Sequence, residues 1–321
     1  MLATTASLRS SSSVAAAVDQ QQVIATNSCN ADNSSSSLYT LTSKRKLSPN
    51  SYLLRYSLPT GRKNLSDDLT IPTCIKILYP DGTDAKTGNA RPLEKSYSPV
   101  SHPNVEGYMD LIVKAYPPRP GGGVGDYLCN MNVGEMIHGT VKGKRIMHGS
   151  ASVLNRWNNI GLIAGGTGIA PLLQVARIVL ESQDPVDTST SVHLLFINCN
   201  EEDILARDEI EDLASKHSER FHVTYSLTSP TNNSDPTTTS SWKGNIGRGD
   251  MAIIKTALPP PTNDEKTMIL VCGTDGFVAS WAGPVGRAPK NPDGSKGAKI
   301  QGPLLGLLKE AGYTAEEVFK Y

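Results

Sequence analysis

The segment Ile160–Pro171, with the sequence IGLIAGGTGIAP, constrains the fold more than any other part of the chain. A mostly apolar run leads directly into a glycine-rich turn, and Pro171 then opens an apolar run of helical character. Glycines let a backbone approach a ligand closely, and the N–H groups of a first helical turn attract anions. Pro171 suits that turn because its missing N–H would have had no partner there. The segment indicates strand, turn and helix, with the turn holding a nucleotide pyrophosphate or serving as an ordinary α/β connection.

Composition limits the classes of function. The 321 residues are enough for two domains with separate cores. The 31 basic and 31 acidic residues balance, so nothing points to a nucleic-acid partner. No apolar run reaches the roughly 18–20 residues that a bilayer span needs.

The cysteines and histidines show no clustered pattern. The five cysteines lie far apart and form no Cys-x-x-Cys pair, which argues against a disulfide framework and for a reducing compartment. The six histidines have no ligand spacing, so no metal site is expected.

Residues 1–38 differ from the rest of the chain. They are rich in Ser, Ala, Thr, Asn and Gln and lack a hydrophobic period, which predicts a disordered tail. They contain only two acids, Asp19 and Asp32, together with Arg9, so a mitochondrial transit segment is the alternative. We therefore expect a mitochondrial location, with the cytoplasm or the endoplasmic reticulum surface as alternatives.

Residues 39–150 have a β pattern. Short strands are predicted at Tyr52–Leu58, Cys74–Tyr79 and Tyr108–Tyr116, separated by Gly- and Pro-containing turns. In the third strand Lys114 projects from the face opposite Met109, Leu111 and Val113. The pattern predicts a small antiparallel β-barrel with a short helix beginning near Gly125.

Residues 151–321 alternate between strands and helices. The predicted strands are Gly161–Ala164, Val192–Ile197, Phe221–Leu227 and Met268–Cys272. The predicted helices are Pro171–Glu181, Asp203–His217, Asp250–Ala257 and Leu304–Ala311, with loops at Ser229–Ser241 and Ala282–Gln301. Thr314 and Glu317 have the spacing of a helix capping box. The alternation predicts a doubly wound parallel sheet whose ligands bind at the carboxyl ends of the strands.

Several local sequences in this order resemble one known group of proteins. The sequences are KSYSPVS at 95–101, LIVK at 111–114, GGGVGDYL at 121–128, GGTGIAP at 165–171, DILAR at 203–207 and VCG at 271–273. Together, from residue 39 to the end, they resemble the ferredoxin-reductase superfamily, and within it the NADH–cytochrome b5 reductases. The fold class that follows is an antiparallel β-barrel FAD domain and a doubly wound parallel NAD(P)H domain.

The resemblance implies a flavin site in the first domain. The segment Lys95, Ser96, Tyr97 and Ser98 matches the family motif Arg-x-Tyr-Thr/Ser-Pro, with lysine in the place of arginine. Lysine keeps the charge that meets the FAD pyrophosphate but loses the bidentate fork, and a solvated strand residue is the alternative for Lys95. Tyr97 would lie against the isoalloxazine ring, and the Ser98 hydroxyl would hydrogen-bond near its N5.

Two further segments match the family's FAD contacts. Ile112 and Lys114 match the strand that contacts the cofactor, although a solvent-facing lysine on an amphipathic strand is the alternative. The segment that receives FAD phosphate in the family matches Gly123, Val124 and Gly125. An ordinary glycine turn is the alternative. Gly125 stands where relatives often have Ser or Thr.

The nicotinamide nucleotide is expected in the second domain. Gly165, Gly166, Thr167 and Gly168 match the turn beneath it, and Ala170 replaces the family's usual threonine. Cys272, Gly273, Thr274 and Asp275 match the segment beside the nicotinamide, with Thr-Asp-Gly replacing a Pro-rich continuation as a compact turn. Cys272 would shape this site without acting as a nucleophile; a small buried hydrophobe is the alternative.

Thr228 follows the third strand of the second domain, where many relatives have an acid near the adenosine ribose. A carboxylate would repel a 2′-phosphate, whereas threonine does not. The resemblance therefore implies NADH as donor with some use of NADPH.

The resemblance implies that NADH passes a hydride to FAD, which passes single electrons to cytochrome b5 or a similar haem protein. Ser98 and Cys272 would lie at the reacting rings. Tyr321 would pack nearby after an edge strand, with a frayed terminus as the alternative. Lys142, Lys144 and Arg145 form a candidate docking patch, with a solvated loop as the alternative. We expect a monomer, associated with a membrane only peripherally if at all.

Two alternatives stay open at this level. The same fold could serve another one-electron acceptor, as in nitrate-reductase-type or oxygenase-type modules. A non-enzymatic scaffold without flavin is the other, since a fold does not fix a function.

Overall fold

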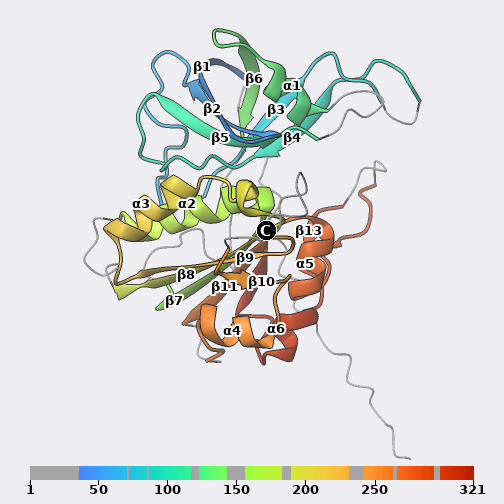
Figure 1. The fold of residues 1–321 in the computed structure, drawn as a ribbon. Helices are drawn as coiled ribbons and strands as arrows, with labels where there is room; N and C mark the ends of the chain where they lie inside the picture. Colours follow the sequence, from blue (N-terminus) through green and yellow to red (C-terminus); the bar gives the residue numbers. More distant parts are fainter. Residues whose placement is uncertain are drawn as a thin grey trace, which may run out of the picture.

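The structure is a computed structural model, and it describes residues 36–70, 72–84, 87–116, 123–142, 156–182, 189–230, 242–262, 266–292 and 297–321. The chain forms two lobes, a smaller β lobe followed by a larger α/β lobe (Figure 1). The C-terminus lies where the two lobes meet.

The first lobe is an antiparallel sheet with a short helix. Its strands are β1 Ser37–Ser48, β2 Ser51–Ser57, β3 Ile75–Tyr79, β4 Leu93–Tyr97, β5 Tyr108–Lys114 and β6 Met136–Val141, and its helix is α1 Val124–Asn130. The strand order is β4-β3-β6-β1-β2-β5, and every pair is antiparallel. The predicted strands at 52–58, 74–79 and 108–116 and the helix near Gly125 are confirmed within two residues; β1, β4 and β6 are additional.

The sheet curls so that its two outer strands approach each other. Three residues after the end of β4, the Val100 N–H donates to the Asp110 carbonyl of β5 over 2.9 Å, and the Asp110 N–H donates to the Ser101 hydroxyl over 3.2 Å. Tyr39, Leu54 and Leu111 are among the fully buried side chains that fill the interior, and α1 contacts β3, β4 and β5. This closed arrangement confirms the predicted antiparallel barrel.

The second lobe is a six-stranded sheet with helices on both faces. Its strands are β7 Asn159–Gly165, β8 Ser191–Asn198, β9 Phe221–Leu227, β10 Asn245–Ile246, β11 Thr267–Cys272 and β14 Val318–Lys320, in the order β10-β9-β8-β7-β11-β14 and parallel throughout. Its helices are α2 Ile169–Leu180, α3 Arg207–Lys216, α4 Met251–Ala257, α5 Asp275–Ala282 and α6 Gly306–Glu310. The predicted doubly wound parallel sheet is confirmed, and β14 is the predicted edge strand.

Successive residues of the central strands enter different cores. Leu162 of β7 packs with α2 and α3, whereas Ile163 packs with α4, α5 and α6. Helices α2 and α3 cover the face of the sheet that is turned toward the first lobe, and the other three cover the opposite face (Figure 1). Burial on both faces explains why these strands are continuous apolar runs in the sequence.

The interface between the lobes is packed. Val100 and Ile112 of the first lobe are buried in the same core cluster as α2. Gln174 of α2 is only 2% exposed, and its side-chain oxygen accepts a hydrogen bond of 2.9 Å from the Thr73 backbone N–H. Arg45 forms an ion pair with Glu209 of α3. The face of β5 that carries Lys114 is therefore turned toward the second lobe, because Ile112 on that face is buried there.

The predicted helix at 203–217 is shorter than expected. A single 3₁₀ turn, Glu201–Asp203, comes first, and α3 begins only at Arg207. Ala206 between them has φ 54° and ψ 37°, a left-handed conformation that interrupts the helix. The core beside α2 buries Ile204, Leu205 and Ala206. The free energy gained by burying them outweighs the hydrogen bonds of a continued helix.

Two other local predictions were wrong. Thr314 and Glu317 do hydrogen-bond, with the Glu317 carboxylate accepting from the Thr314 N–H over 2.9 Å, but no helix follows. The other carboxylate oxygen accepts from the Thr262 N–H over 2.9 Å, so the glutamate joins two loops instead of capping a helix. The predicted loop Ala282–Gln301 contains a small antiparallel pair, β12 Gly286–Arg287 and β13 Lys299–Ile300.

Lys320 of β14 is 4% exposed, and its ammonium donates to the carbonyl oxygens of Pro284, Gly302 and Pro303 over 3.3, 3.4 and 2.7 Å. We expect Lys320→Met to lower the free energy of unfolding by about 1–3 kcal/mol, because these carbonyls lose their donor. The measurement is urea denaturation, with the exposed Lys309→Met as the control.

The wild type and Lys320→Met also test how the free energy of unfolding depends on pH. Burial lowers the pKa of Lys320 from 10.5 to about 8. Between these values the unfolded chain binds more protons than the folded one, so the stability of the wild type should rise with pH relative to Lys320→Met. Parallel stability curves over this window would contradict the lowered pKa.

Candidate functional site

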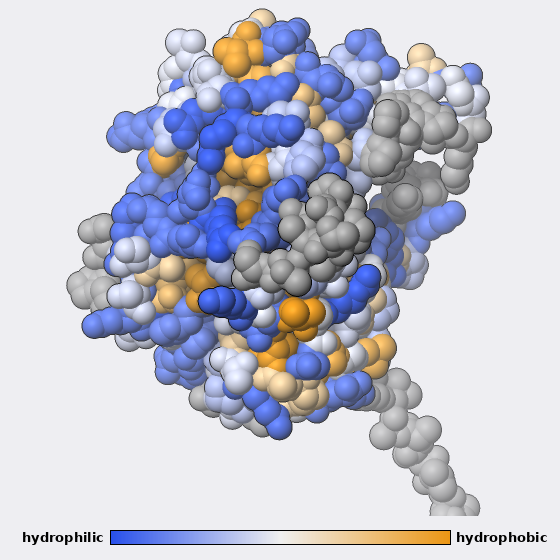
Figure 2. Space-filling model, in the orientation of Figure 1, coloured by the Kyte–Doolittle hydropathy of each residue, from blue (hydrophilic) through white to orange (hydrophobic). Residues whose placement is uncertain are grey.

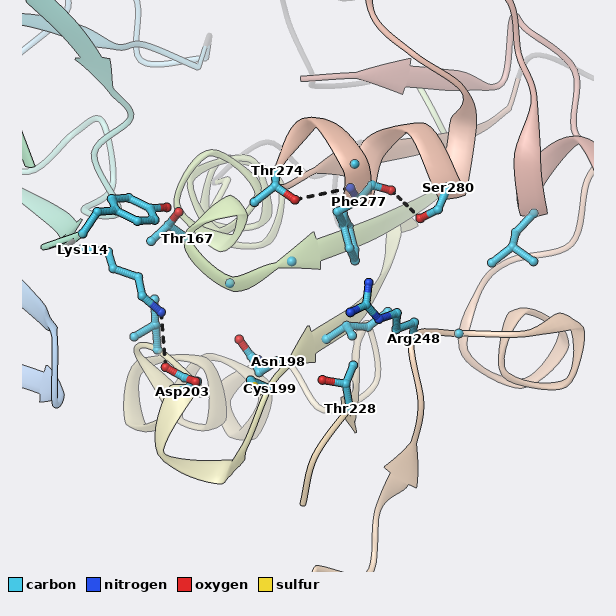
Figure 3. A pocket seen from close by; sticks show the side chains of 18 residues that line it. Lys114, Thr167, Asn198, Cys199, Asp203, Thr228, Arg248, Thr274, Phe277 and Ser280 are labelled. Atoms are coloured by element: carbon cyan, nitrogen blue, oxygen red, sulfur yellow. Dashed lines mark hydrogen bonds and ion pairs between the residues drawn. The ribbon is translucent and has the colours of Figure 1, made fainter. Parts of the chain in front are cut away.

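A cavity of about 600 Å³ lies at the carboxyl edge of the parallel sheet. The ends of β7, β8 and β9, the first turns of α5 and two residues of the first lobe, Lys114 and Tyr116, line it (Figure 3). Figure 2 shows hydrophobic residues between hydrophilic ones near the junction of the lobes, on the face that it draws. The cavity therefore draws on both lobes and is large enough for a nucleotide-sized ligand.

The strand order of the parallel sheet predicts a ligand site between β7 and β11. The chain enters the sheet at β7, adds β8, β9 and β10 on one side, and then adds β11 and β14 on the other. The loops after β7 and β11 therefore leave the sheet side by side, at the point where the winding reverses. Open α/β sheets bind ligands at such a point.

These two loops are in backbone contact. A Cβ on Gly168 would overlap the Cys272 carbonyl oxygen, so the turn after β7 and the turn after β11 can meet only with glycine at 168. Gly166, two residues earlier, has φ +51°, which also favours glycine. Pro171 lies in the first turn of α2, as predicted, and Gly168 precedes that helix with no side-chain cap hydrogen bond.

Phe277 of α5 occupies a slot that two glycines create. A Cβ on Gly165 would lie 2.9 Å from the Phe277 ring, and one on Gly273 would lie 2.5 Å from it. Thr274 begins the helix, because its hydroxyl accepts from the Phe277 N–H over 3.3 Å. The compact turn expected at 274–276 is thus the start of α5. A Thr-Asp pair before an apolar run is a helix start signal that could have revealed it.

Predicted residues fall into two groups around the cavity. Those that line it are Lys114, Gly165, Gly166, Thr167, Thr228 and Thr274. The cavity lining does not include Gly168, Cys272, Gly273 or Asp275, although Gly168 and Cys272 contact each other and Gly165–Thr167 and Thr274 on either side of them line it. Cys272 ends β11 and is half-buried.

Lys114 crosses the cavity to an acid of the other lobe. Its ammonium lies 3.5 Å from an Asp203 carboxylate oxygen, and the side chains of both residues are about a quarter exposed or less. The Asn200 side-chain oxygen accepts from the Asp203 N–H over 3.1 Å and holds the 3₁₀ turn that presents this acid. Sequence reasoning placed Asp203 in a helix and did not identify the pair.

The predicted flavin residues lie at the edge of the barrel, next to the cavity. The Lys95 ammonium lies 5.3 Å from the centre of the Tyr97 ring and 5.6 Å from that of Tyr116, which lines the cavity. Tyr97 packs against the barrel core, and its buried hydroxyl has no hydrogen-bond partner among the described residues. Burial raises the pKa of Tyr97, so this hydroxyl stays protonated and can donate.

Gly125 has a packing role that sequence did not indicate. A Cβ there would lie 2.7 Å from the Lys114 carbonyl oxygen and 3.6 Å from the Tyr97 hydroxyl. A serine or threonine at this position therefore has no room in this chain. Ser96 is exposed and Ser98 is half-buried just past β4, whereas Val124 is buried at the start of α1 and Gly123 precedes it. Ile112 is buried between the lobes.

These groups fit a flavin dinucleotide. The cations of Lys95 and Lys114 suit phosphate, and the Tyr97 hydroxyl is a buried donor that has no acceptor among the described residues. Among the described residues no cluster of ligating side chains could hold a metal ion. In the same part of the chain, no helix has the length and hydrophobicity of a membrane span.

Comparison with known proteins agrees with this arrangement. Residues 38–145 match the oxidoreductase FAD-binding domain family, and residues 162–282 match the oxidoreductase NAD-binding domain family. The chain is 34% identical to NADH-cytochrome b5 reductase 2 of Emericella nidulans over 86% of this chain and 74% of that protein. It is 32% identical to an NADH-cytochrome b5 reductase-like protein of Arabidopsis thaliana, over 86% of this chain and 74% of that one.

A solved structure shows the same fold. The cytochrome b5 reductase domain of Ulva prolifera nitrate reductase superimposes with a TM-score of 0.66 at 24% identity, covering 89% of this chain and 97% of that one.

Proposed function

The chain belongs to the NADH–cytochrome b5 reductase family of FAD- and NAD-binding oxidoreductases, and on this premise we propose that it transfers electrons from NADH through FAD to cytochrome b5 or a similar haem protein. The observation that carries the proposal is the cavity at the winding reversal of the parallel sheet, which draws Lys114 and Tyr116 from the FAD-binding lobe.

FAD, when held by these residues, would supply the chemistry that links a two-electron donor such as NADH to a one-electron acceptor. The protein's part is to position the two dinucleotides and to balance their charge. The packed Gly168–Cys272 contact fixes the two loops of the second lobe, and the buried Ile112 fixes β5 against that lobe. The dinucleotides would thus be held at a closely packed interface.

The first lobe supplies two positive charges at the cavity. Lys114 projects into the cavity, and Lys95 lies over the tyrosine that lines it. Both cations stand where the anionic phosphates of the cofactors would bring negative charge. The Ser98 hydroxyl follows β4 directly, and we assign it to the flavin N5 and Cys272 to the nicotinamide side.

The remaining properties are parts of the same proposal. An acidic acceptor would dock on basic residues, of which Lys142 is exposed, whereas Lys144 and Arg145 lie outside the described residues. The acid-poor residues 1–35 are also outside them, and they support a mitochondrial location. We propose a monomer that associates with membranes peripherally.

The test is NADH-dependent reduction of ferricyanide and of cytochrome b5 by the purified full-length chain, with flavin measured after denaturation. We expect a yellow protein that releases FAD and reduces both acceptors. Reduction of ferricyanide but not of cytochrome b5 would assign the chain to another one-electron partner. A colourless protein without NADH oxidation would show a scaffold instead of an enzyme.

A further inference from the structure

Among the described residues, the cavity has a positive charge without an opposing acid at the carboxyl end of β9. Asp203 is the sole acid among the cavity-lining residues that the structure describes, and it pairs with Lys114. The second cation of the lining is Arg248, whose guanidinium points into the cavity near Thr228 (Figure 3). Within the described chain Arg248 has no ion-pair partner.

Arg248 is held beside Thr228 by the sheet. Strand β10 pairs with the end of β9, and the Gly247 N–H donates to the Leu227 carbonyl oxygen over 2.9 Å. The Ser226 hydroxyl donates to the Gly247 carbonyl oxygen, also over 2.9 Å. These hydrogen bonds join Gly247 to Ser226 and Leu227. The next residue of each segment, Arg248 and Thr228, therefore lies at the same edge of the sheet.

The residues around Arg248 are also fixed. Gly249 has φ +105°, and a Cβ there would overlap the Trp281 ring, so the backbone lies tightly on that ring. Asp250 is the nearest carboxylate in sequence, but it caps α4 by accepting from the Ala252 and Ile253 N–H groups over 2.9 Å each. Its carboxylate thus faces the helix, and among the described residues it forms no ion pair with Arg248.

Thr228 has no negative charge to oppose an anion. Its backbone N–H donates to the Asn198 carbonyl oxygen over 2.9 Å, which sets it at the carboxyl end of β9 beside β8. In dinucleotide-binding folds an acid beside the ribose accepts its 2′-hydroxyl and excludes a 2′-phosphate, whereas an arginine accepts that phosphate. A planar guanidinium suits a phosphate particularly well.

We propose that Arg248, with Thr228, forms a subsite for the 2′-phosphate of NADPH, and that Arg248 makes this chain accept NADPH alongside NADH. This inference rests on the proposed reductase function but concerns the donor alone. It is independent of which acceptor the chain reduces.

Binding of adenosine fragments tests the subsite without any redox turnover. We expect calorimetry to show that the purified holoprotein binds 2′,5′-ADP about tenfold more tightly than 5′-AMP, as one charge-assisted phosphate contact would give. Arg248→Ala should remove this preference, and Thr228→Asp should reverse it. Lys243→Ala, an exposed cation on the same segment that is outside the cavity lining, should leave it unchanged.

Steady-state kinetics with ferricyanide provides the second readout. Arg248→Ala should lower kcat/KM for NADPH about tenfold while changing that for NADH less than about threefold. Equal binding of the two fragments by the wild type, or equal losses with both donors in Arg248→Ala, would overturn the subsite. Failure to reduce cytochrome b5 with the 2′,5′-ADP preference intact would overturn only the proposed acceptor.

Discussion

Replacing Gly168 with alanine should lower kcat/KM for NADH about 100-fold, because displacement of reacting groups by about 1 Å has effects of that size. The new Cβ would overlap the carbonyl oxygen and carbon of Cys272, and these are backbone atoms that cannot rotate away. The turn after β7 must then separate from the turn after β11. Both turns belong to the site where the nicotinamide nucleotide is expected, so binding and orientation fail together.

The matched control is Gly276→Ala. This residue also lines the cavity, but a Cβ there meets nothing within 4 Å. The measurements are ferricyanide reduction at varied NADH and thermal unfolding, which separates a disturbed site from an unfolded lobe. Wild-type kinetics in a folded Gly168→Ala protein would show that the loop contact does not position the donor.

Replacing Lys114 with alanine should lower kcat/KM for NADH roughly 30-fold, equivalent to about 2 kcal/mol of lost charge complementarity. The change removes the cation that crosses the cavity and leaves the Asp203 carboxylate, 3.5 Å away in the wild type, facing the anionic cofactors alone. Both effects act in the same direction. The expected loss is larger at low salt, because screening weakens it.

A second variant separates these two effects. Asp203→Asn keeps the lysine and removes the repelling carboxylate, so we expect NADH to bind as well as in the wild type or better. In Lys114→Ala with Asp203→Asn, part of the single-variant loss should be recovered, as coupled neighbours require. The control is Lys63→Ala, which breaks an exposed 2.8 Å ion pair with Glu106 elsewhere on the barrel. An active Lys114→Ala enzyme would show that the pair only joins the lobes.

Local sequence patterns predicted the framework of the site correctly. The apolar run before Gly165 gave β7, and Pro171 lies in the first turn of α2. Asp250 begins α4 as predicted, with its carboxylate bonded to the first-turn N–H groups. Such features depend on residues a few positions apart, whose backbone preferences and apolar spacing act wherever the segment lies.

Long-range packing explains where the local patterns failed. Ala206 adopts a left-handed conformation because Ile204 and Leu205 turn into the core beside α2, which a helical pattern cannot reveal. Glu317 has capping-box spacing, yet its carboxylate joins Thr314 to the distant Thr262. In both cases a contact made only after folding outweighs the local preference.

The sequence by itself determined a β pattern followed by alternating strands and helices, and the glycine turn at the carboxyl end of β7, because these patterns depend on residues a few positions apart. Only the tertiary structure decided the electrostatics of the cavity. Lys114 and Asp203 are 89 positions apart and meet across two lobes. Arg248 reaches Thr228 because β10 adds to the sheet beside β9. Strand order and lobe packing bring these charges together, and both arise from burial of surfaces that lie far apart in the sequence.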